Sequence, residues 1–265
     1  MEKLINNAPI LEFDNDSAEE AKKFFFAQGK KPFEKFDKIK KLGIHKCVVF
    51  FSRCFDECTE LYKKCKKIYD FKSASSVLPV YNYDNKVLIA LSPLGGPAAA
   101  NLMEELSYVG IDTFIACGAC GCIVDDIDFV NDFFIPTEAI RDEGLSYHYL
   151  PASRTVKTNK DVNIAIEKAL INRNKPYVMG LTWTTDAMYR ETPNRVARRV
   201  KEGAIGVDME CASLAAVAKF NKLNFGEVMY FTDKVGTESW EWRIYDKVKL
   251  RTEIIKLCID ALMML

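Results

Sequence analysis

The chain has 265 residues, of which 49% are hydrophobic and 28% are charged, proportions typical of an ordinary soluble globular protein. Basic and acidic residues both number 37, and this zero formal charge argues against a nucleic-acid or membrane-surface partner, which would need a basic excess. No apolar stretch approaches the ~18 residues that span a bilayer. No signal peptide is visible, and the 9 cysteines are odd in number, so we expect a reduced, cytoplasmic protein.

Residues 1–44 are predicted to form an N-terminal extension to a domain that spans residues 45–265. The stretch Ser17–Glu20 has the form of a capping box, and the aromatic run Phe24–Phe26 follows it. Such a run needs burial, so we expect the extension to pack on its own domain or on a neighbouring subunit.

In the first part of the domain, strands are predicted at short apolar runs and helices where apolar residues recur every three to four positions. In chain order these are the strand Cys47–Phe51, a helix with Leu61, Cys65 and Ile68 on one side, the strands Val77–Tyr81 and Val87–Leu91, the helix Ala98–Val109 and the strand Thr113–Cys117. Asp84-Asn85 between two of these strands indicates a hairpin, which makes the sheet mixed.

The second part continues the alternation of strand and helix. The predicted elements are a strand over Phe129–Ile135, a polar loop over Arg141–Thr158, the helix Ile164–Ile171, the strand Tyr177–Trp183, the helix Arg195–Lys201 after Thr192-Pro193, strands ending at Val207 and Thr232, and a long helix over Ile244–Met264. No internal repeat, linker or low-complexity block interrupts the pattern. The sequence therefore predicts a single three-layer α/β/α domain around a central twisted sheet, mixed but mostly parallel.

Two acidic segments each follow a predicted strand. Val207-Asp208-Met209-Glu210 ends one strand and opens a helix, and Asp233 follows the strand that ends at Thr232. Ligands of α/β enzymes lie at such strand ends. A pair of acids there suits the cleavage of a glycosidic bond, because one carboxylate can hold the sugar while the other protonates the leaving group. Structural acids that cap helices are the alternative.

Further motifs resemble the purine nucleoside and uridine phosphorylase family over about residues 45–262. They are Leu94-Gly95-Gly96-Pro97-Ala98, Glu104-Glu105-Leu106, Phe114–Gly121, Thr184–Tyr189 and Val207–Glu210. The resemblance implies a homo-oligomer, a dimer or a hexamer, that binds a nucleoside with phosphate as co-substrate and uses no other cofactor. It also implies that Glu210 and Asp233 are catalytic, and that the substrate is bound by Met209, Met188, Tyr189, Gly118, Ala119 and His148.

The resemblance implies separate roles for these residues. Glu210 binds the ribose hydroxyls, a geometry in which a carboxylate also stabilises a sugar ring that gains positive charge. Asp233 matches the acid that purine-specific relatives direct at the base, where protonation of N7 makes the purine a better leaving group. The loop Arg190–Asn194 lacks the glutamine and arginine that uridine-cleaving relatives use, which favours a purine substrate.

The phosphate site departs from the family pattern. The family's Gly-Asp-Pro-x-Arg turn is replaced by Ser52–Asp56, and an arginine and a hydroxyl residue are replaced by Ala116 and Ala119. Arg53 is the candidate for a remaining phosphate contact, together with backbone N–H groups from Gly118 onward. Asp56 is the candidate for activating water instead, as in the nucleosidase branch of the superfamily.

The cysteines of Cys117–Cys122 form a lone C-x-x-C pattern, which cannot complete a tetrahedral zinc site from local sequence, so we expect no metal. The sequence favours a nucleoside phosphorylase that cleaves the N-glycosidic bond, with a preference for purine nucleosides. A nucleosidase that hydrolyses the same bond is one alternative, and a nucleoside-binding protein without turnover is the other.

Overall fold

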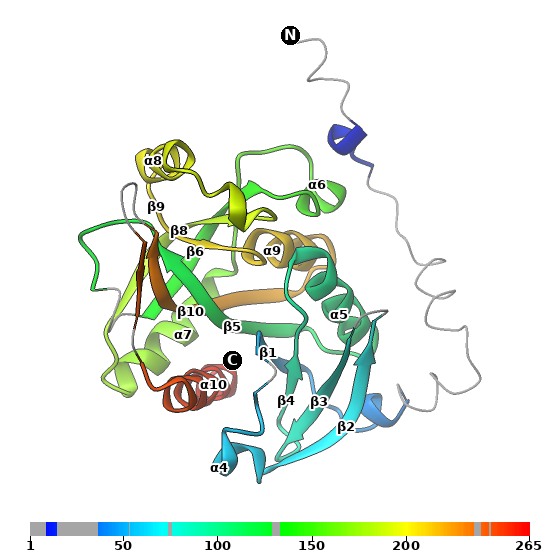
Figure 1. The fold of residues 1–265 in the computed structure, drawn as a ribbon. Helices are drawn as coiled ribbons and strands as arrows, with labels where there is room; N and C mark the ends of the chain where they lie inside the picture. Colours follow the sequence, from blue (N-terminus) through cyan, green and yellow to red (C-terminus); the bar gives the residue numbers. More distant parts are fainter. Residues whose placement is uncertain are drawn as a thin grey trace.

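The computed structural model describes residues 9–14, 37–52, 54–73, 76–128, 133–235, 240–243 and 245–265 (Figure 1). The predicted capping box, the Phe24–Phe26 run and Arg53 lie outside the described residues. None of the described helices has the length and apolar character needed to cross a membrane.

Strands and helices alternate along the described chain. The strands are β1 (Lys46–Phe50), β2 (Cys65–Lys72), β3 (Val77–Tyr83), β4 (Val87–Leu91), β5 (Thr113–Cys122), β6 (Phe133–Asp142), β7 (Thr155–Lys157), β8 (Tyr177–Thr185), β9 (Ala204–Asp208), β10 (Asn224–Val235) and β11 (Trp240–Trp242). The helices are α4 (Thr59–Tyr62), α5 (Gly96–Tyr108), α6 (Ser146–Tyr149), α7 (Lys160–Asn172), α8 (Pro193–Lys201), α9 (Cys211–Phe220) and α10 (Lys247–Met263), with 3₁₀ turns η1 (Pro9–Leu11) and η2 (Met188–Arg190).

All the described strands belong to one mixed sheet, which confirms the predicted α/β fold class. Its order is β11-β10-β6-β8-β9-β5-β1-β4-β3-β2, with β7 beside β6. Neighbours run parallel from β4 through β1 and β5 to β10, and again from β6 through β8 to β9. Because β10 also pairs with β5, the strands β10, β6, β8, β9 and β5 close into a ring, which the sequence did not predict.

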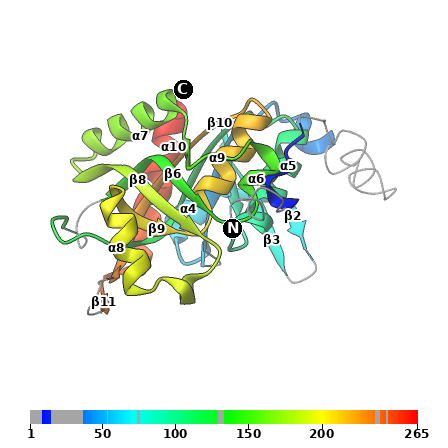
Figure 2. The same cartoon turned by 90° about the horizontal axis from the view of Figure 1, so that it is seen from above.

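Helices pack on both faces of the part of the sheet formed by β1, β4, β5 and β10. In Figure 1 α5 lies beside α9 on one side, and α7 lies beside α10 on the other; Figure 2 gives the view from above. Strand β1 alternates between the two cores: Val48 and Phe50 pack with α7 and α10, whereas Cys47 and Val49 pack with α5 and α9. Both faces are therefore apolar, as the continuous apolar run of β1 predicted.

A smaller apolar cluster, which includes Cys120, Phe134 and Phe231, packs among the strands of the ring. The rings of Phe134 and Phe231 stack with their centroids 5.6 Å apart. Gly206 on β9 has no side chain because a Cβ there would lie 2.9 Å from the Phe134 ring. Because aromatic side chains pack directly against glycine backbone, the strands approach one another closely enough for the sheet to close on itself.

Two local predictions were wrong. The helix expected over Leu61–Ile68 ends at Tyr62, and Cys65–Lys72 is strand β2 instead. The apolar spacing fitted a helix, but Ile68, Tyr69 and Phe71 favour a strand, and antiparallel pairing with β3 decides the outcome. The polar loop expected over Arg141–Thr158 contains the end of β6, the short helix α6 and strand β7.

The predicted hairpin is confirmed. Asp84 and Asn85 have φ angles of 53° and 54°, left-handed values that Asp and Asn tolerate in turns. The turn joins β3 and β4 in antiparallel register.

Candidate active site

The turn between β9 and α9 is held by Asp208. Its carboxylate accepts hydrogen bonds from the hydroxyls of Thr182 (3.0 Å) and Thr184 (2.9 Å), and from the backbone N–H groups of Glu210 (2.9 Å) and Cys211 (2.6 Å). Thr184 Oγ1 also accepts from the N–H of Ala212 at 3.0 Å. Asp208 and Thr184 therefore satisfy the first N–H groups of α9, which is a structural role.

Because Asp208 and Thr184 cap α9, the side chain of Glu210 does not have to do so. It occupies the N-cap position of α9 but makes no side-chain cap hydrogen bond. Instead its Oε1 accepts the backbone N–H of Gly95 at 2.6 Å, across the edge of the sheet at the start of α5. Gly95 has a φ of 93°, which glycine adopts without strain. A carboxylate that is 6% exposed and is not used to cap its own helix is available to a ligand.

Asp233 lies across β5 from this turn. On β5, Gly121 pairs with Val207 of β9 on one side and with Asp233 of β10 on the other. A Cβ on Gly121 would lie 3.7 Å from Asp233 Oδ2 and 2.9 Å from a methyl group of Val207. Glycine at this point lets the two acidic strand ends approach each other. Asp233 is 8% exposed, and its Oδ1 lies 2.7 Å from the hydroxyl of Thr232.

Two further carboxyl groups interact with these acids and were not predicted. Glu191, which follows η2, lies in the electrostatic field of Asp233 and Asp208. Glu227 on β10 is almost fully buried, forms a side-chain hydrogen bond with Cys211, and leaves its Oε2 without a partner. The sequence contained a signal for Glu227, which is a lone acid within the apolar run of β10. It contained no signal for Glu191. The acid cluster is defined here as Glu191, Asp208, Glu210, Glu227 and Asp233.

Burial raises the pKa of every member of the acid cluster. The pKa of Glu210 rises to about 7, first because of burial and then because of the charge of Asp208. The pKa of Glu191 also rises to about 7, from burial and the charges of Asp233 and Asp208. Burial also raises the pKa of Asp208, Asp233 and Glu227, and for Glu227 the charges of Asp208 and Glu210 add to the effect. At neutral pH the cluster thus holds both protonated and ionised carboxyls.

The backbone of β5 is open next to these acids. Pairing with β1 ends at Cys117 and pairing with β9 begins at Gly121, so residues 118–120 face no described strand on that edge. Ala119 is exposed although its neighbours on β5 are buried. Of the predicted ligand residues, Ala119 is therefore exposed at this unpaired edge of β5, whereas Gly118 is buried against Phe51.

A cavity of about 360 Å³ lies beside Gly95, where β1 and β4 end. Its lining includes the hydroxyl-bearing residues Ser52 and Ser92, together with Leu94 and Ala98 at the beginning of α5. A volume of this size accommodates a small polar ligand, and no member of the acid cluster lines the cavity.

The remaining predicted binding residues are less buried than most of the acid cluster. Met209 is half-buried between Asp208 and Glu210. Met188 and Tyr189 lie in η2, and Tyr189 is 92% exposed. His148 is exposed on α6. The described chain therefore brings Met209 next to the acid cluster and leaves the other three open to solvent.

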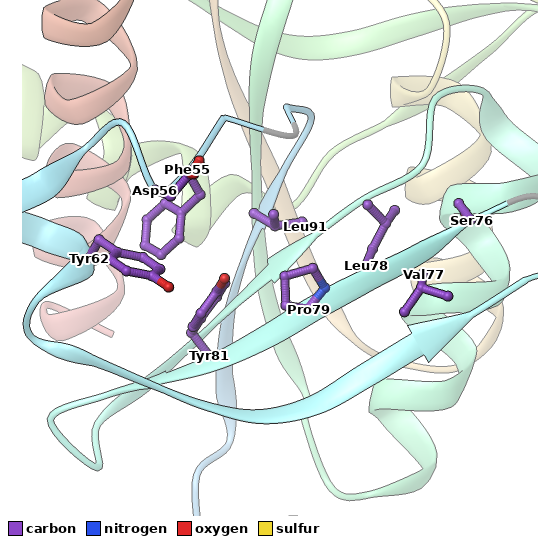
Figure 3. A pocket seen from close by; sticks show the side chains of 9 residues that line it. All are labelled: Phe55, Asp56, Tyr62, Ser76, Val77, Leu78, Pro79, Tyr81 and Leu91. Atoms are coloured by element: carbon purple, nitrogen blue, oxygen red, sulfur yellow. The ribbon is translucent and has the colours of Figure 1, made fainter.

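Asp56, the candidate for activating water, lines a different cavity. This cavity of about 410 Å³ is also lined by Phe55, Tyr62 and Tyr81, and Figure 3 shows these side chains between the loop after β1, α4 and β3. None of the carboxyl groups of the acid cluster lines it.

The cysteines of β5 are buried and free, and the Sγ atoms of Cys120 and Cys122 donate to backbone carbonyls. Within the described ranges no group of three or more His, Cys, Asp or Glu residues is placed to hold a metal ion.

Comparison with known proteins identifies one family. The profile described as "Phosphorylase superfamily" matches residues 56–260, well over half of the chain. Guanosine phosphorylase of Halorubrum lacusprofundi is 30% identical over 148 residues, which cover 56% of this chain and 61% of that protein.

Two uridine phosphorylases are similar over shorter stretches. The enzyme of Thermococcus kodakarensis is 32% identical over 103 residues, which cover 39% of this chain and 37% of the relative. The enzyme of Haemophilus influenzae is 32% identical over 104 residues, which cover 39% of this chain and 40% of the relative. The chain thus spans less than two thirds of the length of these curated relatives.

Proposed function

Since the chain belongs to the phosphorylase superfamily, we propose that it is a nucleoside phosphorylase, a pentosyltransferase that cleaves an N-glycosidic bond with phosphate. The observation that carries the proposal is that Gly121 of β5 pairs with Val207, three residues before Glu210, on one side and with Asp233 on the other, and that both acids are buried. Phosphate is the co-substrate, and the products are the free base and ribose 1-phosphate.

The two acids have different roles in the proposed reaction. Protonated Asp233 gives its proton to N7 of the base as the C1′–N9 bond breaks, so that the purine leaves as a neutral molecule. Ionised Glu210 accepts hydrogen bonds from the ribose hydroxyls and stabilises the positive charge that develops on the sugar. A phosphate oxygen then forms the new bond to C1′. The raised pKa of Asp233 supports its role as an acid, because burial favours the protonated form.

A purine is the favoured base in this proposal. Asp233 supplies a proton that a purine needs more than a pyrimidine does, and the loop Arg190–Asn194 lacks the amide and guanidinium pair expected for uracil. The relatives' names include both guanosine and uridine phosphorylases, so a substrate panel has to decide.

Hydrolysis of the same bond is the second candidate, and one observation favours it. None of the ion pairs or charge contacts found in the described ranges joins a lysine or arginine to the acid cluster. A cluster of carboxyls repels a phosphate dianion but not water. For phosphorolysis, phosphate would therefore have to bind through the unpaired backbone edge of residues 118–120, the serine-lined cavity and Arg53.

The test is base release from a panel of inosine, guanosine, adenosine, uridine and cytidine, with and without phosphate. Phosphorolysis predicts phosphate-dependent turnover with ribose 1-phosphate as the sugar product, and Arg53→Ala should raise the KM for phosphate. Free ribose as the sole sugar product in saturating phosphate would establish hydrolysis instead. No base release from any nucleoside would leave only a binding function.

A further inference from the structure

Strand β11 carries an exposed tryptophan opposite Asp233. β11 runs antiparallel to β10, and its register puts Trp242 opposite Asp233 and Trp240 opposite Val235. Trp242 is 74% exposed and Trp240 is 47% exposed, whereas Trp183, the third tryptophan of the chain, is fully buried. Two large aromatic side chains that share one face of a strand in solvent form an exposed apolar patch, and such patches mark binding surfaces.

Trp242 and Asp233 project from the same face of the sheet. Residues directly opposite each other in an antiparallel pair share a face, with their Cβ atoms about 4.5–5.5 Å apart. On the other side of Asp233 its partner is Gly121 of β5, and a Cβ there would lie 3.7 Å from Asp233 Oδ2. Methyl groups of Val207 and Val235 border this position. Across the strands Asp233 therefore lies between a glycine in apolar surroundings and an indole.

The two opposed side chains differ in length. Aspartate is short and an indole is long, which agrees with exposed fractions of 8% for Asp233 and 74% for Trp242. The indole thus extends beyond the carboxyl as a flat apolar surface. A planar ring stacked on this surface can present its edge to the carboxyl below. Small-molecule sites combine apolar area with a few polar groups in this way, since the first supplies affinity and the second fixes orientation.

We propose that Trp242 is the stacking surface for the nucleobase and that it selects a bicyclic purine. The inference rests on the proposed function, in which Asp233 protonates the leaving base. A purine covers more of an indole than a pyrimidine does, so stacking at this position favours purine nucleosides. Stacking also holds the plane of the base while its edge faces Asp233, which is the geometry that proton transfer requires.

Met188 and Tyr189 are the other candidates for contacting the base. Both lie in η2, which follows β8, and the neighbours of β8 in the sheet are β6 and β9. Trp242 differs from them because strand pairing itself sets it opposite Asp233. Tyr189, which is 92% exposed, is the aromatic residue against which Trp242 is compared in the test.

Base binding is tested on the full-length protein without turnover. The measurement is equilibrium dialysis with hypoxanthine, guanine or uracil in phosphate buffer. Trp242→Leu keeps an apolar side chain and removes the aromatic face, and we expect it to raise the dissociation constant for both purines about 10-fold or more. Trp242→Phe should recover part of the affinity, and uracil should be affected less. Trp240→Leu, on the same face of β11, is the matched control and should leave purine binding nearly unchanged.

Kinetics and light scattering complete the test. If the protein releases base, Trp242→Leu should raise the KM for the purine nucleoside in parallel with the dissociation constant, at unchanged molecular mass. Wild-type purine affinity in Trp242→Leu, equal losses in Trp240→Leu, or a loss in Tyr189→Leu alone would overturn the inference. So would a change of mass in Trp242→Leu, which would place Trp242 at a contact with a second copy of the chain.

Failure of the proposed function gives a different result. A wild-type protein that releases no base but binds purines through Trp242 would refute the phosphorylase activity and support the stacking role. Base release with purine affinity that is independent of Trp242 would support the activity and refute the stacking role. A wild-type protein that binds none of the bases and releases none would refute both.

Discussion

The substitution Glu210→Gln tests two separate effects of the buried carboxylate. One is its contribution to turnover, and the other is its cost to the stability of the fold. The amide has nearly the same shape and keeps an oxygen to accept the N–H of Gly95, now 2.6 Å from Oε1. What is lost is the negative charge. Because Asp208 and Thr184 carry the capping of α9, we expect the helix to stay in place.

The effect on turnover should be large. A preorganised group that stabilises charge in the transition state contributes roughly 10²–10³ in kcat, so we expect a loss in that range for Glu210→Gln. The pKa of about 7 for Glu210 adds a pH dependence, since the carboxylate must be ionised to act. In the wild type kcat/KM should rise between about pH 6 and pH 8, and this limb should be absent from any residual activity of the variant.

The effect on stability has the opposite sign. The folded-state pKa of about 7 lies above the ordinary 4.5, so the folded protein retains a proton that the unfolded chain releases. Stability therefore falls as pH rises from about 4.5 to about 7, and the ionised carboxylate costs roughly 3 kcal/mol above that window. Glutamine carries no charge, so the variant should be more stable than wild type by about 1–3 kcal/mol at pH 8 and nearly equal to it at pH 5.

The measurements are base release at pH 6 to 8 and urea unfolding at pH 5 and pH 8. Glu60→Gln removes an exposed carboxylate from α4 and serves as the charge-matched control, with no expected change in either assay. A folded Glu210→Gln protein with more than half of the wild-type kcat would refute the catalytic role. A stability difference that is the same at both pH values would refute the argument from burial.

Three further predictions follow from the geometry. Asp233→Asn should reduce kcat on purine nucleosides far more than on pyrimidine nucleosides, because the amide cannot protonate N7; equal losses in parallel assays would make Asp233 a structural residue. Gly96→Ala would place a Cβ 2.2 Å from Ser213 Oγ, between α5 and α9, and should destabilise the fold by about 1–3 kcal/mol in urea unfolding, whereas an unchanged midpoint would contradict the packing. We also propose a homo-oligomer, a dimer or a hexamer, which light scattering checks; a fully active monomer of 30.1 kDa would exclude it.

Several features of this protein follow from local sequence patterns. The apolar run of β1, the Asp84-Asn85 turn and the periodicity of α7 identified their elements, because burial on both faces, left-handed turn geometry and one apolar helix face each leave a local signature. Glu210 was placed correctly in the same way, since it follows strand β9 within a motif. The prediction that Asp233 follows a strand ending at Thr232 was wrong, because β10 continues to Val235 and pairs with β11 at Asp233.

Tertiary structure decided what depends on pairing between distant segments. Residues 65–72 became a strand because β3 was available as a partner, and the ring closed because β10 pairs with both β5 and β6. That closure brings Glu191 into the electrostatic field of Asp233, and packing of α9 on β10 places Glu227 against Cys211. Asp56, which follows β1 closely in sequence, lines a cavity that no member of the acid cluster lines. Spacing along the chain does not encode such contacts, because they arise only when strands far apart in sequence share one sheet.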